Sequence, residues 1–252
     1  MRIRAIGASV TGALALCALA VPAAQADGGY GDTAITKVVV DGDNKVVVGT
    51  SGAVTVKVSV TAKDDSGIAD AAYISLEGPD YGYYGGSKPT CKAVDSTTST
   101  CTSSVKIDPK VDFLSNANAG TWYVSTWIDA NDDDFITADK AGSFKFQRAA
   151  KLTANATPEP VKKGKTLTVT GSLTRANWES LKYSAYGSQS VKLQFRKKSS
   201  SAYTTVKSIK ATSKGALKTT TKATVDGYYR FSFAGNGTTG AVSSTGDFVD
   251  VK

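Results

Sequence analysis

Residues 54–61 read Val-Thr-Val-Lys-Val-Ser-Val-Thr, a strict alternation of apolar and polar side chains. Because successive side chains of a β-strand point to opposite faces, this period of two predicts a strand with one buried face. Valine runs at 38–40 and 46–48 flank a polar turn at 41–44, and alternation returns at 122–128. The first half of the chain is therefore expected to consist of short antiparallel strands.

The second half of the chain repeats this pattern. Apolar residues share one face over residues 167–173, 191–195 and 229–233. Outside the N-terminal segment no helical period is sustained over three turns, although residues 176–186 can hold one short helix. Each half offers about seven short strands, the number and spacing of an Ig-like β-sandwich. We expect an all-β fold with two tandem Ig-like antiparallel β-sandwich domains; a β-barrel is the alternative.

The N-terminal segment has the features of an export signal. Two arginines precede an uncharged stretch rich in alanine and leucine at 5–21, and Ala-Gln-Ala at 24–26 is a small-x-small cleavage site. We therefore expect a signal peptide over residues 1–26 and a secreted, extracellular chain. A membrane anchor would need the stop-transfer charges that are missing, and a lipoprotein cysteine at Cys17 would need a small residue where Leu16 stands. We expect no membrane insertion.

Two cysteines, Cys91 and Cys101, remain after cleavage of this segment. An exported chain with two cysteines is expected to oxidise them to a disulfide. The closed loop is short, so the bond should contribute about 2–3 kcal/mol. Free thiols and a redox-active pair are the alternatives, and the second lacks the usual CxxC spacing.

The composition excludes several kinds of site. The chain has no histidine and three cysteines, which rules out Ser-His-Asp triads, histidine-based zinc sites and four-cysteine metal sites. Residues 27–149 carry 11 Lys and Arg against 17 Asp and Glu, a net charge of −6. Residues 150–252 carry 17 against 5, a net charge of +12. This asymmetry predicts an acidic domain over 27–149, with the disulfide, and a basic domain over 150–252.

Four motifs of the second half resemble a known group of proteins. They are Thr-Pro-Glu-Pro-Val-Lys-Lys-Gly-Lys-Thr-Leu-Thr-Val-Thr-Gly at 157–171, Leu-Thr-Arg-Ala-Asn-Trp at 173–178, Val-Lys-Leu-Gln-Phe-Arg at 191–196 and Gly-Tyr-Tyr-Arg-Phe at 227–231. They resemble the Ig-like modules of actinobacterial secreted proteins. The whole chain is similar to a group of such two-domain proteins, some of them named calcium-binding protein. The resemblance implies the fold and carries no established mechanism.

The segment 129–139 reads Asp-Ala-Asn-Asp-Asp-Asp-Phe-Ile-Thr-Ala-Asp, which is similar to the start of an EF-hand calcium loop. By that spacing the ligands are side-chain oxygens and one backbone carbonyl, from Asp129, Asn131, Asp133 and Phe135. Position 6 of the loop is Asp134 instead of glycine. Position 12 is Lys140 instead of glutamate, with Asp139 beside it as a further acid. These departures predict weak affinity.

Topology adds two acids to this loop. If 122–128 and 142–148 are strands F and G, the acidic segment is the F–G loop, and the B–C loop with Asp64 and Asp65 lies at the same end. Oxygen ligands without histidine or cysteine favour Ca²⁺ over transition metals. We expect a calcium site here. A polar hairpin with its carboxylates spread into water is the alternative.

Two surface features point to further ligands. Lys192, Arg196 and Arg230 should point outward from neighbouring strands, as a face suited to wall teichoic acid or another anionic cell-envelope polymer. A merely solvated basic face is the alternative, and the chain has no motif that reads nucleic acid. Tyrosines in the glycine-rich segment 78–86 can form a sugar-binding or adhesive surface, or can simply pack.

These observations predict a secreted, non-catalytic binding protein. A purely structural or assembly protein without metal is the alternative. A carboxylate-dependent glycosidase is the least favoured reading. Such an enzyme needs two carboxyl groups about 5–10 Å apart in a cleft, whereas the acids of this chain gather on a loop.

Overall fold

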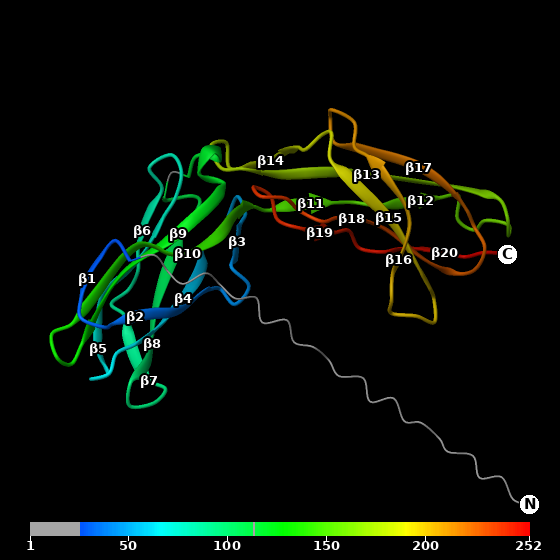
Figure 1. The fold of residues 1–252 in the computed structure, drawn as a ribbon. Helices are drawn as coiled ribbons and strands as arrows, with labels where there is room; N and C mark the ends of the chain where they lie inside the picture. Colours follow the sequence, from blue (N-terminus) through cyan, green and yellow to red (C-terminus); the bar gives the residue numbers. More distant parts are fainter. Residues whose placement is uncertain (1–25, 113) are drawn as a thin grey trace, which may run out of the picture.

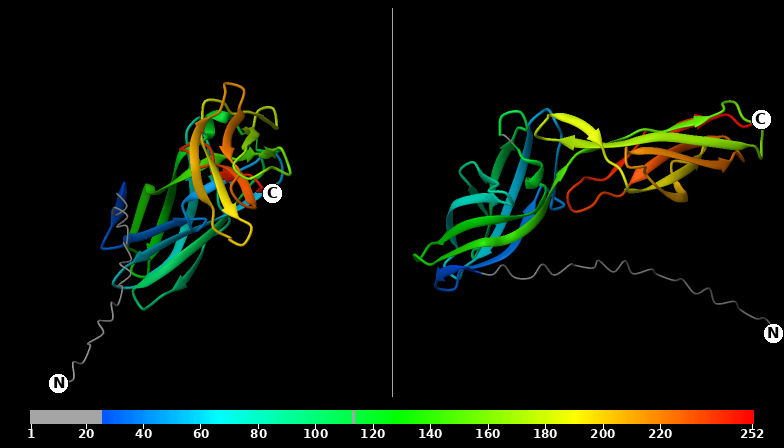
Figure 2. Two further views of the ribbon diagram at one scale, coloured as in Figure 1. Left: turned by 90° about the vertical axis from the view of Figure 1, so that its right-hand side faces the viewer. Right: turned by 90° about the horizontal axis from the view of Figure 1, so that it is seen from above.

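The computed structural model describes residues 26–112 and 114–252. Apart from Ala26, the predicted signal peptide, including Cys17, lies outside these residues. Within the described part, no helix is both long and apolar enough to cross a membrane. The strands form two sandwiches that lie end to end (Figure 1 and Figure 2).

The first sandwich consists of two facing sheets. One has the order β2-β4-β8-β7, and its strands are Ala34–Val40, Val54–Lys63, Thr98–Ile107 and Thr90–Ala93. The other has the order β1-β10-β9-β5-β6, and its strands are Gly28–Tyr30, Phe135–Arg148, Gly120–Ala130, Ile68–Glu77 and Tyr83–Gly85. In addition β3, Lys45–Val48, runs parallel to the end of β10. This is an Ig-like arrangement, with β4, β5, β9 and β10 as strands B, C, F and G.

The alternation at 54–61 places the core of this sandwich. Val56, Val58 and Val60 are buried between the sheets, whereas Thr55 and Lys57 on the other face are exposed. Trp122 of β9 is fully buried against Phe146 of β10, at 4.7 Å between ring centroids.

The second sandwich pairs a sheet around β13 with a sheet around β15 and β18. The first of these sheets contains β11 (Ala150–Leu152), β12 (Asn155–Thr157), β13 (Thr166–Asn177), β14 (Lys182–Ala185) and β17 (Ala216–Lys222). The second contains β15 (Ser190–Lys197), β16 (Thr204–Lys210), β18 (Gly227–Phe233), β19 (Val242–Ser243) and β20 (Asp247–Val249). The expected all-β fold of tandem Ig-like sandwiches is confirmed.

The prediction that residues 176–186 can hold a short helix is wrong. Strand β13 continues to Asn177, a turn follows, and β14 pairs back onto β13. Trp178, the first residue of the turn, is 2% exposed and belongs to the core of the first sandwich, as does Ala176. Tertiary packing across the two halves therefore decides the local structure here, and not the helix propensity of the segment.

Cys91 and Cys101 lie directly opposite each other in the antiparallel pair β7–β8 and form a disulfide. The predicted bond is confirmed. It ties the edge strand β7 to β8, whose inner face is part of the core.

Candidate functional sites

Three segments meet at the tip of the first sandwich. The turn between β9 and β10 contacts the loop between β4 and β5, because the backbone N–H of Asn131 donates to the carbonyl of Gly67 at 3.0 Å. The side-chain amide of Asn131 donates to the carbonyl of Ser66 at 2.9 Å. The segment after β1 joins them, since the N–H of Asp32 donates to Asp134 Oδ2 at 3.0 Å. Loops far apart in the sequence thus form one surface.

Five carboxylates converge on this tip in two overlapping groups. One group is Asp32, Asp64 and Asp134, and the other is Asp64, Asp65 and Asp132. Within each group, one oxygen of every carboxylate lies within 4.8 Å of the others. Carboxylates this close repel one another unless a cation or hydrogen bonds neutralise them. The arrangement can offer a hard cation several oxygen ligands.

Asp64 is the buried member of both groups, with 3% of its surface exposed. Its Oδ1 accepts from the N–H and the hydroxyl of Ser66 at 2.9 and 2.6 Å, and its Oδ2 accepts from the hydroxyl of Thr33 at 2.6 Å. Burial acts to raise the pKa of Asp64, but the hydrogen bonds from Ser66 and Thr33 outweigh it and lower the pKa. Asp64 is therefore an ionised anchor of the loop, with little acceptor capacity left for an ion.

Of the residues predicted to ligate calcium, the structure brings Asp64 and Asp65 to this tip. Asp129, Asp133 and Asp139 belong to neither group of converging acids. Asp129 instead accepts from the indole N–H of Trp127 at 2.7 Å. The side chain of Asp139 accepts from Ser125 at 3.4 Å, further along the sheet.

The other two predicted ligands also have structural partners. Asn131 uses its amide to hold the neighbouring loop, and the ring of Phe135 stacks on Trp127 at 5.1 Å. Sequence reasoning missed Asp32, Asp132 and Asp134. The hairpin turn, rather than an EF-hand loop, decides which acids face the β4–β5 loop. Asp32 is 102 residues from its partner Asp134, so no local pattern could have indicated it.

The predicted basic residues share the outer face of the β15–β18 sheet. Arg196 pairs with Tyr228 across the two strands, and Arg230 pairs with Gln194. Lys192 lies on the same face and is exposed, because the alternate residues Val191 and Leu193 are buried. The structure thus brings the three predicted cations onto one sheet face.

Two tyrosines hold the arginines of this face in place. The guanidinium of Arg196 lies 3.8 Å from the ring centroid of Tyr228 and 5.4 Å from that of Tyr203. The guanidinium of Arg230 lies 3.8 Å from the ring of Tyr203. Arg230 also donates to Gln194 Oε1 at 2.8 Å, and Arg196 to the carbonyl of Ser200 at 2.8 Å. We call Arg196, Arg230, Tyr203 and Tyr228 the arginine–tyrosine ladder.

Every partner in the ladder is neutral. The ion pairs found among the described residues are Lys45–Asp43 and Lys252–Asp250, and neither involves the ladder. Both guanidinium groups therefore keep their full positive charge and most of their N–H donors for a ligand. The sequence predicted that the two arginines share a face, but it did not predict the part of Tyr203. This residue precedes β16 and contacts the arginines only in the folded chain.

No family model matches the chain, and no curated protein matches its sequence. Among solved structures it is similar to a DUF4785 family protein from Legionella pneumophila, with a TM-score of 0.40 and 13% identity over 79% of this chain and 52% of that one. The D0–D1 domain of intimin matches with a TM-score of 0.29 and 14% identity, over 86% of this chain and 98% of that one. The ectodomain of mouse nectin-like molecule 4 matches with a TM-score of 0.24 and 14% identity, over 88% and 65%.

The chain thus spans about half the length of the Legionella protein. Likeness at these TM-scores and identities supports no inference about function. The resemblance to actinobacterial secreted proteins stays a prediction.

Proposed function

We propose that this chain is a non-catalytic extracellular binding protein whose second sandwich binds a phosphate-bearing polymer of the cell envelope. Ig-like sandwiches are common in binding and structural domains outside the cell, and a disulfide suits an oxidising compartment. The proposed contact surface is the arginine–tyrosine ladder together with Lys192.

The ladder is the observation that carries this proposal. A guanidinium presents paired N–H donors in a plane, which matches two oxygens of a phosphate group. Stacking on tyrosine holds that plane in position without neutralising its charge. The net charge of +12 over residues 150–252 would add long-range attraction for a polyanion. A surface of mobile, solvated lysines would have the charge but not the fixed geometry.

Binding of residues 27–252 to purified wall teichoic acid tests the proposal. Affinity should fall steeply from low to physiological ionic strength. Replacing Lys192, Arg196 and Arg230 with glutamate should abolish binding. A control with the same net charge replaces Lys165, Lys214 and Lys218, which are exposed elsewhere on the second sandwich. Equal losses in the two triple variants would show that only net charge matters, and would contradict a site at the ladder.

Calcium binding at the tip of the first sandwich is a second candidate function. The convergence of five carboxylates from three segments favours it. Because Asp64 is occupied by Ser66 and Thr33, an ion in one group would depend chiefly on Asp32 and Asp134, and an ion in the other on Asp65 and Asp132. With mostly exposed ligands, the dissociation constant should lie in the weak extracellular range of about 10⁻⁴–10⁻³ M. Calorimetric titration of residues 27–252 tests this, and no heat of binding at about 10 mM Ca²⁺ would remove the candidate.

A further inference from the structure

The turn between β5 and β6 is fixed onto the core of the first sandwich. Trp122 packs so closely against Gly78 and Gly82 that a Cβ at either position would lie 2.1 or 2.6 Å from its indole. The indole N–H of Trp122 donates to the carbonyl of Asn118 at 2.6 Å, and the amide of Asn118 donates to the carbonyl of Pro79 at 2.9 Å. The fully buried side chain of Trp122 therefore fixes the position of the turn.

The tip of this turn is strained. Asp80 and Tyr81 both have φ of +56°, in the left-handed region that non-glycine residues rarely occupy. The N–H of Gly82 donates to the carbonyl of Pro79 at 3.1 Å, so Asp80 and Tyr81 are the central residues of the hairpin turn, where the favoured turn types need positive φ. The turn leaves Tyr81 100% exposed, and Tyr83 after it is 62% exposed.

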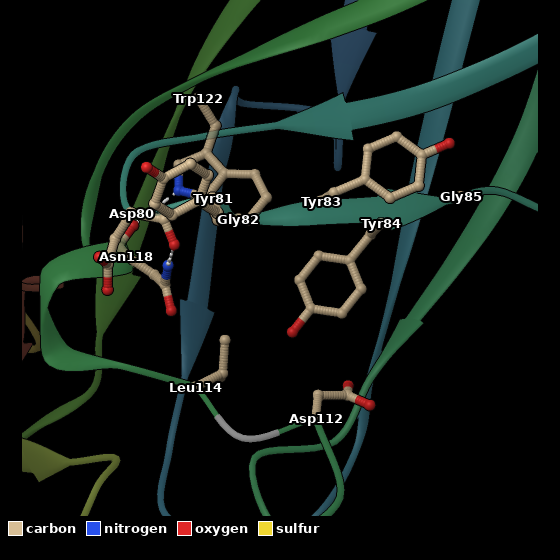
Figure 3. Close-up of a pocket in the computed structure, with 10 residues that line it drawn as sticks. All are labelled: Asp80, Tyr81, Gly82, Tyr83, Tyr84, Gly85, Asp112, Leu114, Asn118 and Trp122. Atoms are coloured by element: carbon tan, nitrogen blue, oxygen red, sulfur yellow. Dashed lines mark hydrogen bonds between the residues drawn. The ribbon is translucent and has the colours of Figure 1, made fainter.

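A hollow of about 390 Å³ lies between this turn and the residues Asp112, Leu114 and Asn118 (Figure 3). Its volume is in the range of small-ligand pockets. Aromatic rings and two carboxylates line it, and we call it the tyrosine pocket; its chief residues are Tyr81, Tyr83, Tyr84, Asp80 and Asp112. In Figure 3 the hydroxyl of Tyr84 points into the space above Leu114 and Asp112.

The polar groups of the pocket suit hydroxyl groups. The ring of Tyr84 stacks on Trp122 at 5.8 Å between centroids. Burial, the charge of Asp112 and a hydrogen bond to that carboxylate raise the pKa of Tyr84, so its hydroxyl stays protonated and is a donor directed at Asp112. Asp112 also accepts from the N–H of Asp108 at 2.7 Å through Oδ2, and the carboxylate of Asp80 is the other acidic acceptor in the lining. The pocket therefore offers both donors and acceptors beside exposed rings.

We propose that the tyrosine pocket binds a neutral saccharide. Flat tyrosine rings can cover the apolar C–H face of a sugar ring, while carboxylates accept hydrogen bonds from its hydroxyl groups. The lining residues that the structure describes include two acids and no lysine or arginine, which disfavours an anionic ligand. The site goes beyond the function proposed above, because it uses a different sandwich and an uncharged ligand.

Titration of residues 27–252 with maltohexaose, cellohexaose and chitohexaose, followed by tryptophan fluorescence and by calorimetry, tests this proposal. At least one of the three should bind. Tyr81→Ala and Tyr83→Ala should each weaken that binding about tenfold or more, since each removes a ring. Asp80→Asn should weaken it several-fold, whereas Tyr81→Phe should keep most of it.

Tyr30→Ala is the matched control, because Tyr30 is 70% exposed in the same sandwich but outside the pocket. It should leave the affinity unchanged, and all variants should keep the melting temperature of the parent. Failure of all three sugars to bind would overturn the proposal. So would binding that Tyr81→Ala and Tyr83→Ala leave intact, or a pocket that binds a proline-rich peptide and no sugar.

Discussion

The ring of Trp178, from the basic half of the chain, lies 5.3 Å from the ring of Phe146, in the core of the acidic half. The indole N–H of Trp178 also donates to the carbonyl of Val48 at 3.2 Å, and its backbone N–H donates to Asn116 Oδ1 at 3.1 Å. The turn after β13 is therefore built into the first sandwich. The two halves share part of one core.

Trp178→Ala should destabilise the protein by about 3–5 kcal/mol, because it leaves a cavity in that core and removes the indole hydrogen bond to Val48, whose carbonyl keeps its bond from the N–H of Ala149. Urea denaturation measures the loss. Trp127→Ala is the matched control, since Trp127 is 37% exposed on the outer face of the first sandwich and should cost much less. Equal losses for the two variants would contradict the structural role given to Trp178.

The strands could be predicted from the sequence, but the packing of Trp178 into the core of the first sandwich could not. The alternation at 54–61 is a local signal, and it lies within β4 at Val54–Lys63. The position of Trp178 depends on a core formed by residues such as Phe146 and Val48, which local periodicity does not report. The acidic tip is similar: the loops could be placed at one end, but the facing acids depend on turn geometry and on Asp32.

Asp64 should make the stability of the first sandwich depend on pH. Its pKa in the folded chain is lowered, so its contribution is fully present above the unfolded value of about 3.9 and is lost as the pH falls through the folded value. Asp64→Asn should cost about 1.5–3 kcal/mol at neutral pH, because hydrogen bonds to a charged group are lost. Urea midpoints from neutral to acid pH should show a weaker acid dependence in the variant. If the variant keeps the acid dependence of the parent, titratable groups other than Asp64 cause that dependence.

Calcium should raise the melting temperature if the acidic tip binds it. At about ten times the dissociation constant the gain is about 1.4 kcal/mol, which is a few degrees for a domain of this size. Mg²⁺ should do less, because it gives up its waters reluctantly. Asp132→Asn combined with Asp134→Asn removes one acid from each group and should abolish the shift, and without metal the double variant should be neutral or slightly stabilising through relief of repulsion.

Asp129→Asn separates the two possible ligand sets. Asp129 has its own partner in Trp127 and lies in neither acidic group, so this variant should keep the calcium shift. Loss of the shift in Asp129→Asn, with retention in the double variant of Asp132 and Asp134, would favour the loop spacing predicted from the sequence over the cluster seen in the structure.

Export and oxidation should determine two measurable properties of the purified protein, its N-terminal residue and its content of free thiols. We expect it to begin at Asp27 and to contain no free thiol, because Cys91 and Cys101 are paired. Intact-mass measurement with and without alkylation checks both, and reduction should cost about 2–3 kcal/mol of stability. Two alkylatable cysteines in the unreduced protein would contradict the disulfide. A diacylglycerol mass on Cys17 would contradict a soluble secreted chain.

Variants of the arginine–tyrosine ladder should show whether polymer binding depends on the fixed geometry of the guanidinium groups or on their positive charge alone. Arg196→Lys combined with Arg230→Lys keeps the net charge but replaces a planar group that stacks on Tyr203 and Tyr228 with a compact ammonium. Binding to wall teichoic acid at physiological salt should weaken about tenfold, since paired hydrogen bonds to phosphate are lost. Tyr203→Ala should weaken it as well, because both arginines lose the same neighbouring ring.

The long-range attraction should be unchanged in these variants, so the slope of affinity against salt should stay close to that of the parent. Lys214→Arg combined with Lys218→Arg is the matched control. It replaces one lysine on β17 and one in the preceding turn with arginine, and it should leave the affinity for the polymer unchanged. If lysine at positions 196 and 230 binds the polymer as tightly as arginine does, charge alone attracts the polymer and the stacked geometry has no part in recognition.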